Sequence, residues 1–262
     1  MRVCVLSSGS TGNATIIETQ EHTILIDSGL SYKKLQSLIK EANFDESKIT
    51  HILITHEHAD HVKGVGVCTR KLGLTICATE KTLNAMLSKG IIKADVEKTQ
   101  ILEKDETVIL GEFSVTPFHI SHDAADPVGY KIVLGDRTLV YLTDVGFVTA
   151  QMINSLKNAD TYIMEVNHNV EMLHMSNRPW SLKQRILSDY GHLSNEDSAY
   201  ALSEMIGDKT RHIYMAHLSE EANMPDLAHM TVKHILKERL VDLSKVSLHM
   251  TYAMRISNVI QL

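Results

Sequence analysis

Short runs of β-branched and apolar residues recur along the chain and predict many β-strands. Each run has the length of a strand in a globular protein, and turn-forming or polar residues separate the runs. The predicted strands cover residues 3–6, 14–18, 23–27, 51–55, 74–77, 113–118, 129–134, 138–143, 161–166 and 211–216.

Apolar residues at helical spacing lie between several of these strands. The spacing predicts helices over 32–42 and 79–88. Further helices are predicted over 180–190, 195–206 and 226–240, with Ser194 as a capping residue and Pro225 in the first turn of the last one. Early strands joined by hairpins, with helices between later strands, predict an α/β layered sandwich of packed sheets with helices outside.

The length of 262 residues is enough to bury one large core. The chain has only four prolines and no low-complexity tract or fixed-period repeat, so we expect a single domain over residues 1–262. No run approaches the roughly 18 apolar residues of a membrane span, and the first apolar stretch is too short for a signal peptide. We therefore expect a cytoplasmic protein with no membrane partner.

Cys4, Cys68 and Cys77 lie in apolar segments and are predicted to be buried thiols.

Ionisable residues follow directly after many of the predicted strands. Strand ends along one edge of a sandwich converge, so residues far apart in the sequence can meet there. The residues in these positions are Asp27, His56, His122, Asp144, Glu165 and His217.

The densest group of metal-binding side chains is His56, His58, Asp60 and His61, within six residues. Neutral imidazole and carboxylate are ligands for zinc, manganese and iron(II). In extended backbone His56 and His58 point the same way and can bind one ion, whereas Asp60 and His61, past the turn, face elsewhere. The motif thus predicts two neighbouring metal positions. The alternative is a polar loop that happens to hold three of the chain's 15 histidines.

The net charge of −6 argues against broad, sequence-independent binding of a polyanion over the protein surface. It does not exclude a nucleic-acid substrate, because two divalent ions would add four positive charges locally.

The order of the metal-binding residues resembles the metallo-β-lactamase superfamily over nearly the whole chain. The resemblance implies an αββα fold of two packed mixed sheets flanked by helices, and a site for two divalent ions. It assigns His56, His58 and His122 to one ion, Asp60, His61 and His217 to the other, and Asp144 to both. His192 is similar to a histidine that contacts the scissile phosphate in nucleases of the superfamily, so the expected catalytic residues are His192, Asp60 and Asp144.

Several assignments have rivals. His119 competes with His122 as a ligand, and His192 and His217 could exchange roles. Asp144 could instead cap the segment that follows it.

Two acidic residues are expected beside the ligands rather than on the metal. Asp27 either orients a ligand histidine or serves in an ordinary turn. Glu165 is expected to orient His192. His168 is interpreted as a loop residue, and the glycine-rich stretch 7–13 as a turn rather than a phosphate cradle, because it lacks the lysine of a P-loop.

Residues 8–13, 121–124 and 191–196 resemble the WalJ/YycJ-type branch of the superfamily. Members of that branch are regarded as DNA exonucleases, which implies a 5′-to-3′ DNA exonuclease that uses a metal-bridging hydroxide. Only 26 residues separate Glu165 from His192, which leaves no room for a large RNA-clamping insertion, so RNA is the less expected substrate.

Two other classes compete with the nuclease. One is a thioester or lactam hydrolase similar to glyoxalase II, which has no obvious use for His192. The other is a non-hydrolytic di-iron or metal-binding scaffold. Redox members of the superfamily usually carry glutamate where this chain has His58. The sequence does not distinguish zinc, manganese and iron, and a homo-oligomer stays open.

Overall fold

The computed structural model describes residues 1–93 and 98–262. Contacts divide the chain into two compact units. Unit 1 contains Met1–His119, Ala124–Gly135 and Tyr252–Leu262, and unit 2 contains Ile120–Asp123 and Asp136–Thr251. The strands belong to two seven-stranded sheets, as the sequence predicts for a layered sandwich.

Unit 1 contains one complete mixed sheet with the strand order β14-β1-β2-β3-β4-β5-β6. Its strands are β1 (Arg2–Ser7), β2 (Ala14–Glu18), β3 (Thr23–Ile26), β4 (Ile49–Leu53), β5 (Thr75–Ala78), β6 (Lys98–Ile101) and β14 (Ile260–Gln261). The hairpin strands pair antiparallel, whereas β3 to β6 run parallel, so the ends of β3 and β4 lie at the same edge. Unit 1 also holds the antiparallel strands β7 (Val108–Leu110), β8 (Phe113–His119) and β9 (Val128–Leu134).

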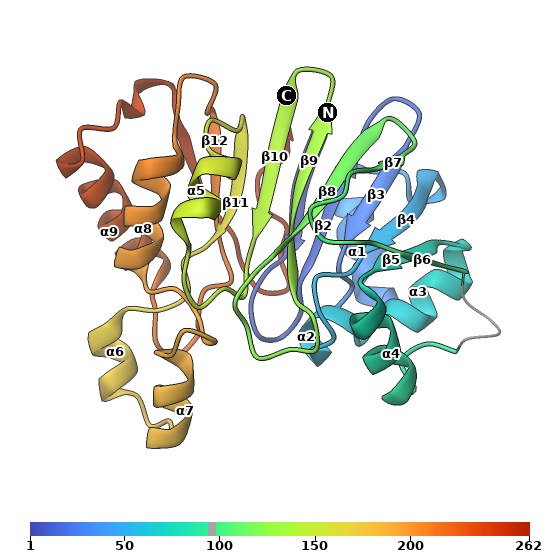
Figure 1. Cartoon of the computed structure of the whole chain (residues 1–262), viewed down its shortest axis with the longest axis horizontal. Coiled ribbons are helices and arrows are strands. Elements are labelled where there is room, and N and C mark those ends of the chain that lie inside the picture. Colours follow the sequence, from blue (N-terminus) through green and yellow to red (C-terminus); the bar gives the residue numbers. More distant parts are fainter. Residues whose placement is uncertain (94–97) are drawn as a thin grey trace. The chain divides into compact units, whose positions relative to one another are not determined.

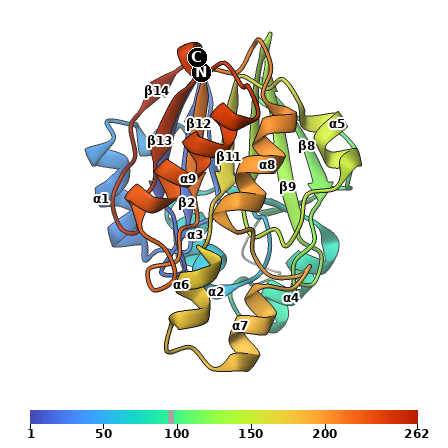
Figure 2. The ribbon, with the colours of Figure 1, turned by 90° about the vertical axis from the view of Figure 1, so that its left-hand side faces the viewer.

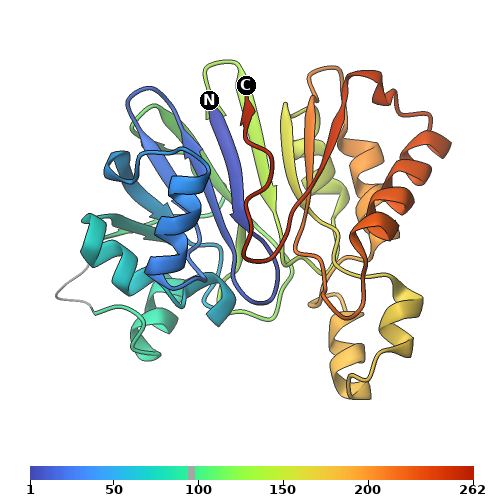
Figure 3. The same ribbon diagram turned by 180° about the vertical axis from the view of Figure 1, so that it is seen from behind.

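The helices of unit 1 bury the apolar face that their sequence pattern predicts. They are α1 (Tyr32–Glu41), α2 (Ala59–Val62), α3 (Val65–Leu72) and α4 (Glu80–Ser88), with a short 3-10 helix at Glu46–Lys48. Leu35, Leu38 and Ile39 of α1 join a buried cluster that includes Leu25 and Ile52 of the sheet. Seen from behind in Figure 3, the blue α1 and the cyan α3 lie in front of the strands. Burial of such side chains stabilises the fold by about 1.5–3 kcal/mol each.

Unit 2 is built on four parallel strands. They are β10 (Arg137–Leu142), β11 (Thr161–Glu165), β12 (His212–Ala216) and β13 (Ser247–Met250). Its helices are α5 (Ala150–Leu156), α6 (Val170–Met175), α7 (Trp180–Ile186), α8 (Asn195–Met205) and α9 (Pro225–Glu238), with a 3-10 helix at Leu243–Lys245. Figures 1 and 2 show α8 and α9 side by side across β11 and β12.

The periodic segments of the sequence are confirmed within a few residues, and two helix starts are confirmed in detail. The Ser194 hydroxyl accepts a hydrogen bond from Asp197 N at 3.0 Å, and Pro225 opens α9. The prediction for 180–190 is too long. The chain turns after Ile186, whose carbonyl accepts from His192 N at 3.0 Å, so residues 187–190 are not helical.

The structure also describes the helix lengths and the cysteines. Within the described residues, no helix is both long and apolar enough to cross a membrane. Cys4, Cys68 and Cys77 are buried free thiols, as predicted. Burial raises the pKa of Cys4 to about 11 and the pKa of each of the other two to about 12, so they are protonated at neutral pH.

Candidate metal-binding residues

The first cluster of candidate ligands lies in unit 1, where the chain leaves β4 and enters the short helix α2. His58 is the N-cap residue of α2, and Asp60 and His61 belong to its single turn. The ring centroids of His56 and His58 lie 4.6 Å apart, and those of His56 and His61 lie 4.2 Å apart. The turn therefore gathers three imidazoles from one short segment. The sequence predicted that His61 faces away from His56 and His58, but its ring lies next to the ring of His56.

A buried hydrogen-bond network holds two of these rings. Asp27 accepts from both the backbone N–H and the hydroxyl of Thr55, at 2.9 and 2.8 Å. The Thr55 hydroxyl also lies 3.0 Å from His56 Nδ1, and His61 Nδ1 lies 2.7 Å from Asp27. Both rings thus turn Nδ1 toward Asp27 and Thr55 and direct Nε2 the other way. A metal-binding histidine is normally oriented in this manner through its second nitrogen.

Burial raises the pKa of Asp27, and the neighbouring His61 and the Thr55 hydrogen bonds oppose that rise. Asp27 has no exposed surface, so its negative charge depends on these partners. Thr55 was not expected from the sequence. The sequence signal that could have identified Thr55 as part of the site is its position directly before His56.

The glycine-rich loop is a turn that packs against α2, as interpreted from the sequence. Asn13 donates its backbone N–H to the Asp60 carbonyl at 2.8 Å, and its side-chain Nδ2 lies 3.0 Å from His61 Nε2. Gly29 allows this approach, because a Cβ there would lie 1.6 Å from the Asp60 carbonyl oxygen. Asn13 is a second residue of the site that sequence analysis missed.

The second cluster lies in unit 2, at the carboxyl ends of its parallel strands. The register aligns Leu142 with Met164 and Glu165 with Ala216, so the residues just past β10 and β12 flank the end of β11. This edge is where ligands bind in open parallel α/β sheets. Within the described residues, one ligand atom from each of four side chains lies within 4.8 Å of the others, and these side chains are Asp144, Glu165, His192 and His217.

Glu165 is the centre of the second cluster. Its Oε1 lies 2.8 Å from His192 Nδ1 and 3.0 Å from His217 Nδ1, and its Oε2 accepts from two backbone N–H groups. Burial alone raises the pKa of Glu165, but the charge and hydrogen bond of His192, together with the His217 hydrogen bond, outweigh it and lower the pKa to about 2. Glu165 is therefore ionised at neutral pH and accepts from both rings, which directs both Nε2 atoms away from it.

Two further contacts hold the histidines of unit 2. Asn167 donates to the His217 carbonyl at 2.7 Å. His122 Nδ1 lies 3.3 Å from the Gly191 carbonyl, and its Nε2 lies 4.0 Å from Asp144 Oδ1. His122 is therefore buried beside Asp144, whereas its sequence rival His119 is an exposed residue at the end of β8.

Three candidate residues share a strained backbone conformation. Asp27, Asp144 and His217 have φ of +58°, +57° and +57°, in the left-handed region. Each comes within two residues of a strand end. Left-handed non-glycine residues cost about 1–3 kcal/mol and concentrate at functional sites. The conformation turns each side chain sharply out of its strand direction.

Glu57 has a structural role in unit 1. Its carboxylate accepts from Ala125 N at 3.0 Å and lies 3.8 Å from Lys89 Nζ. These contacts account for a buried carboxylate without a metal ion.

His168 is buried with neither ring nitrogen hydrogen-bonded to any residue in 1–93 or 98–262. Burial lowers its pKa to about 4, against about 6.5 for an unfolded chain. The folded protein therefore excludes a proton that the unfolded chain binds as the pH falls from about 6.5 to 4. This difference is expected to remove about 3 kcal/mol of the free energy of unfolding across that range.

The His168→Leu variant should lose less stability in acid than the wild type. Urea unfolding at pH 7.5 and pH 4.5 measures the difference, and His234→Leu, whose side chain is 71% exposed, is the control. Equal losses in wild type and His168→Leu would show that His168 does not contribute.

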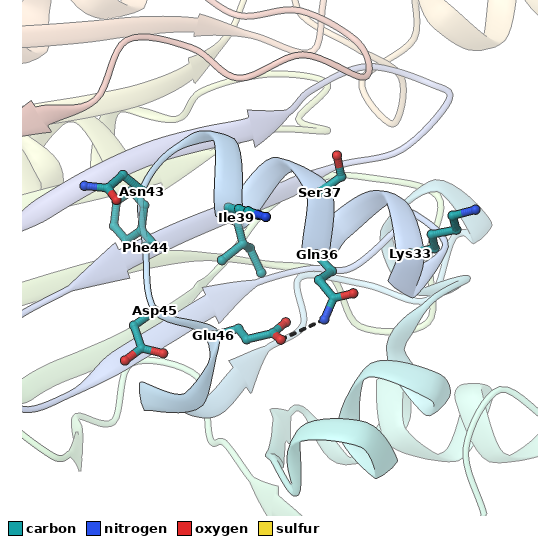
Figure 4. A pocket seen from close by; sticks show the side chains of 9 residues that line it. Lys33, Gln36, Ser37, Ile39, Asn43, Phe44, Asp45 and Glu46 are labelled. Atoms are coloured by element: carbon teal, nitrogen blue, oxygen red, sulfur yellow. Dashed lines mark hydrogen bonds between the residues drawn. The ribbon is translucent and has the colours of Figure 1, made fainter.

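A separate pocket in unit 1 has different chemistry. It has a volume of about 600 Å³ and lies beside α1, where Gln36 donates to Glu46 at 2.7 Å (Figure 4). Its lining contains lysine, glutamine, serine and carboxylate side chains but no histidine. It does not contain the predicted ligands.

Comparisons with known proteins agree with this fold. A family model described as "Beta-lactamase superfamily domain" matches residues 22–218. The metallo-β-lactamase fold protein YhfI from Bacillus subtilis has a TM-score of 0.74 and 16% identity, over 97% of this chain and 98% of that one. Zn(2+)-bound PqqB from Methylobacterium extorquens has a TM-score of 0.73 and 16% identity, over the full length of both chains. The predicted metallo-β-lactamase sandwich is confirmed.

Two curated relatives are much more similar in sequence. The exodeoxyribonuclease WalJ of Streptococcus pneumoniae is 46% identical over 235 residues, which are 89% of this chain and 87% of that protein. The exodeoxyribonuclease YycJ of Bacillus anthracis is 44% identical over 90% of this chain and 89% of its own length. The chain therefore belongs to the metallo-β-lactamase fold superfamily, in the family of the exodeoxyribonucleases WalJ and YycJ.

Proposed function

We propose that the protein is a metal-dependent DNA exonuclease that degrades DNA from the 5′ end. The observation that carries the proposal is the cluster of Asp144, Glu165, His192 and His217, in which His192 alone is partly exposed, in a chain 44–46% identical to exodeoxyribonucleases. The 5′ polarity rests on the resemblance to that family alone.

Two divalent ions, of zinc, manganese or iron, belong to the proposal. His56, His58 and His122 are assigned to one, Asp60, His61 and His217 to the other, and Asp144 to both. The donor set supports this assignment, because imidazole and carboxylate ligands suit these metals. Bound ions would activate water and neutralise the charge that develops on the phosphate. One catalytic domain over residues 1–262 is also part of the proposal.

His192 is proposed to act on the substrate phosphate. Its Nδ1 donates to the ionised Glu165 at 2.8 Å, so its Nε2 faces away from Glu165. When protonated, the His192 imidazole would hydrogen-bond a phosphate oxygen or donate a proton to the leaving oxygen, while Glu165 orients the ring. Glu165 and Asp27 are positioning residues, since each contacts a histidine that has a proposed direct role. Asp60 is assigned a part in catalysis as well as in metal binding.

DNA is proposed as the substrate rather than RNA. The named activity of both relatives supports DNA, and the short segment between Glu165 and His192 supports access at a strand end. Because the net charge is −6, we expect modest affinity that weakens as salt rises. A DNA substrate agrees with the cytoplasmic location expected from the sequence.

Product analysis on labelled nucleic acids tests the proposal. Linear DNA labelled at the 5′ or the 3′ end, circular DNA and matched RNA are incubated with the manganese or the zinc form. Early release of 5′ mononucleotides from linear DNA, with circles spared, is expected. Equal cutting of circles would overturn the exonuclease assignment. Rapid thioester hydrolysis without phosphodiester cleavage would establish the glyoxalase II-like alternative instead.

A further inference from the structure

Two exposed aromatic side chains lie in the loops that carry candidate catalytic residues of unit 2. Phe147 is three residues after Asp144, and Tyr190 is two residues before His192. Their exposed fractions are 42% and 61%. Only 5% of the chain is aromatic, so two such exposed residues in these particular loops are informative.

Hydrogen bonds and close packing connect the loop that carries Phe147 to the loop that carries Tyr190. Gly146 N donates to the Ser121 carbonyl at 2.8 Å, and the Ser121 hydroxyl donates to the Asp189 carbonyl at 2.6 Å. Gly146 also packs directly on the second loop, since a Cβ there would lie 2.0 Å from Asp189 O and 2.8 Å from Tyr190 N. Phe147 and Tyr190 therefore extend from adjacent backbone segments that cannot move apart freely.

The basic residues near Tyr190 in the sequence hold the surrounding segment in place: Arg178 pairs with Glu221, and the buried Lys183 donates to the His174 and Ser176 carbonyls. Residues 178–192 contain three basic residues and one acidic residue, in a chain with a net charge of −6. The half-exposed guanidinium of Arg185 binds both carboxylate oxygens of Asp123, next to His122. Exposed aromatic rings beside candidate catalytic residues suit single strands of nucleic acid, because every base has a face that stacks on a ring.

We propose that Phe147 and Tyr190 form a stacking platform for the bases next to the scissile phosphodiester, an inference that rests on the proposed nuclease function. Stacking on a rigid pair of loops fixes the nucleotide relative to His192 and Asp144 without reading its base. Sequence-tolerant binding is what an exonuclease requires, since every base has a face that stacks. The platform holds the DNA end and takes no part in the chemical step.

The variants Tyr190→Ala and Phe147→Ala test the platform. Binding of a phosphorothioate single-stranded DNA, which resists cleavage, is measured by fluorescence anisotropy with the metal-loaded full chain. Each substitution is expected to weaken binding by about 10-fold, whereas Tyr190→Phe, which keeps the ring, binds like wild type. Tyr200→Ala is the control, because Tyr200 is an exposed residue of α8.

Two further measurements separate stacking from other effects. A DNA with abasic residues at its end is expected to bind wild type about 10-fold more weakly, and Tyr190→Ala is expected to add little to that loss. The dependence of the dissociation constant on salt should be unchanged in Tyr190→Ala, because no charge is removed. KM for cleavable DNA should rise more than kcat falls.

The possible failures are distinguishable. If wild type cleaves DNA and the alanine variants bind it normally, or if abasic ends and Tyr190→Ala weaken binding independently, the stacking platform is wrong and the nuclease function stands. A changed salt dependence in Tyr190→Ala would also overturn it. If wild type neither binds nor cleaves DNA, the proposed function itself fails.

Discussion

Replacing Asp144 by asparagine is expected to lower the metal content below the proposed two ions per chain and to slow DNA hydrolysis roughly 10³-fold. Asp144 is buried, and its Oδ1 lies 3.4 Å from His217 Nδ1 and 4.0 Å from His122 Nε2. Asparagine keeps the shape of the side chain but removes the negative charge that the two ions are proposed to share. Elemental analysis and initial rates on end-labelled DNA measure both effects.

Asparagine is preferable to alanine at this position for a backbone reason. Asp144 has φ of +57°, a conformation that asparagine tolerates and that costs other residues about 1–2 kcal/mol. Asp144→Ala is therefore expected to lower the melting temperature as well as the metal content. Asp136→Asn is the matched control, because the Asp136 side chain is 86% exposed. Two firmly bound ions and normal activity in Asp144→Asn would remove Asp144 from the site.

The sequence predicted that Asp144, Glu165 and His217 converge, because residues at strand ends have a local and periodic signal. Asp144, Glu165 and His217 each follow a run of apolar residues, and parallel strands bring such ends together. The prediction that Glu165 orients His192 needed only their order along the chain, and the structure places them in contact at 2.8 Å. Periodicity thus carries information about which residues share an edge.

Contacts that depend on loop conformation were not predictable in this way. Thr55, Asn13 and Asn167 contact candidate ligands through turns that have no hydrophobic period. The left-handed backbone of His217 has no sequence signal either, since glycine is the usual residue in that conformation. The short strands β6, β7, β13 and β14 were missed because two to four residues are too few to define an alternation.

His192 and His217 differ in exposure although both contact Glu165, and this difference supports the separate roles proposed for them. His217 is 4% exposed and is also held by Asn167, whereas the His192 side chain is 17% exposed and lies next to the loop that carries Tyr190. A ligand is expected to be the more enclosed of the two, and a group that meets the substrate the more accessible.

The His192→Ala variant is expected to lower turnover by roughly 10²-fold or more and to keep its metal, because a general acid or oxyanion partner is lost while the ligands stay. His217→Ala is expected to lose metal instead. Glu165→Gln should slow turnover by about 10- to 100-fold, since the imidazole keeps a hydrogen-bond partner but loses the negative charge beside it. His174→Ala, at an exposed position in the same segment, is the control. Metal content, turnover and its pH profile are measured for each variant. If His192→Ala loses metal while His217→Ala retains it, the two histidines have exchanged roles, and the phosphate contact belongs to His217.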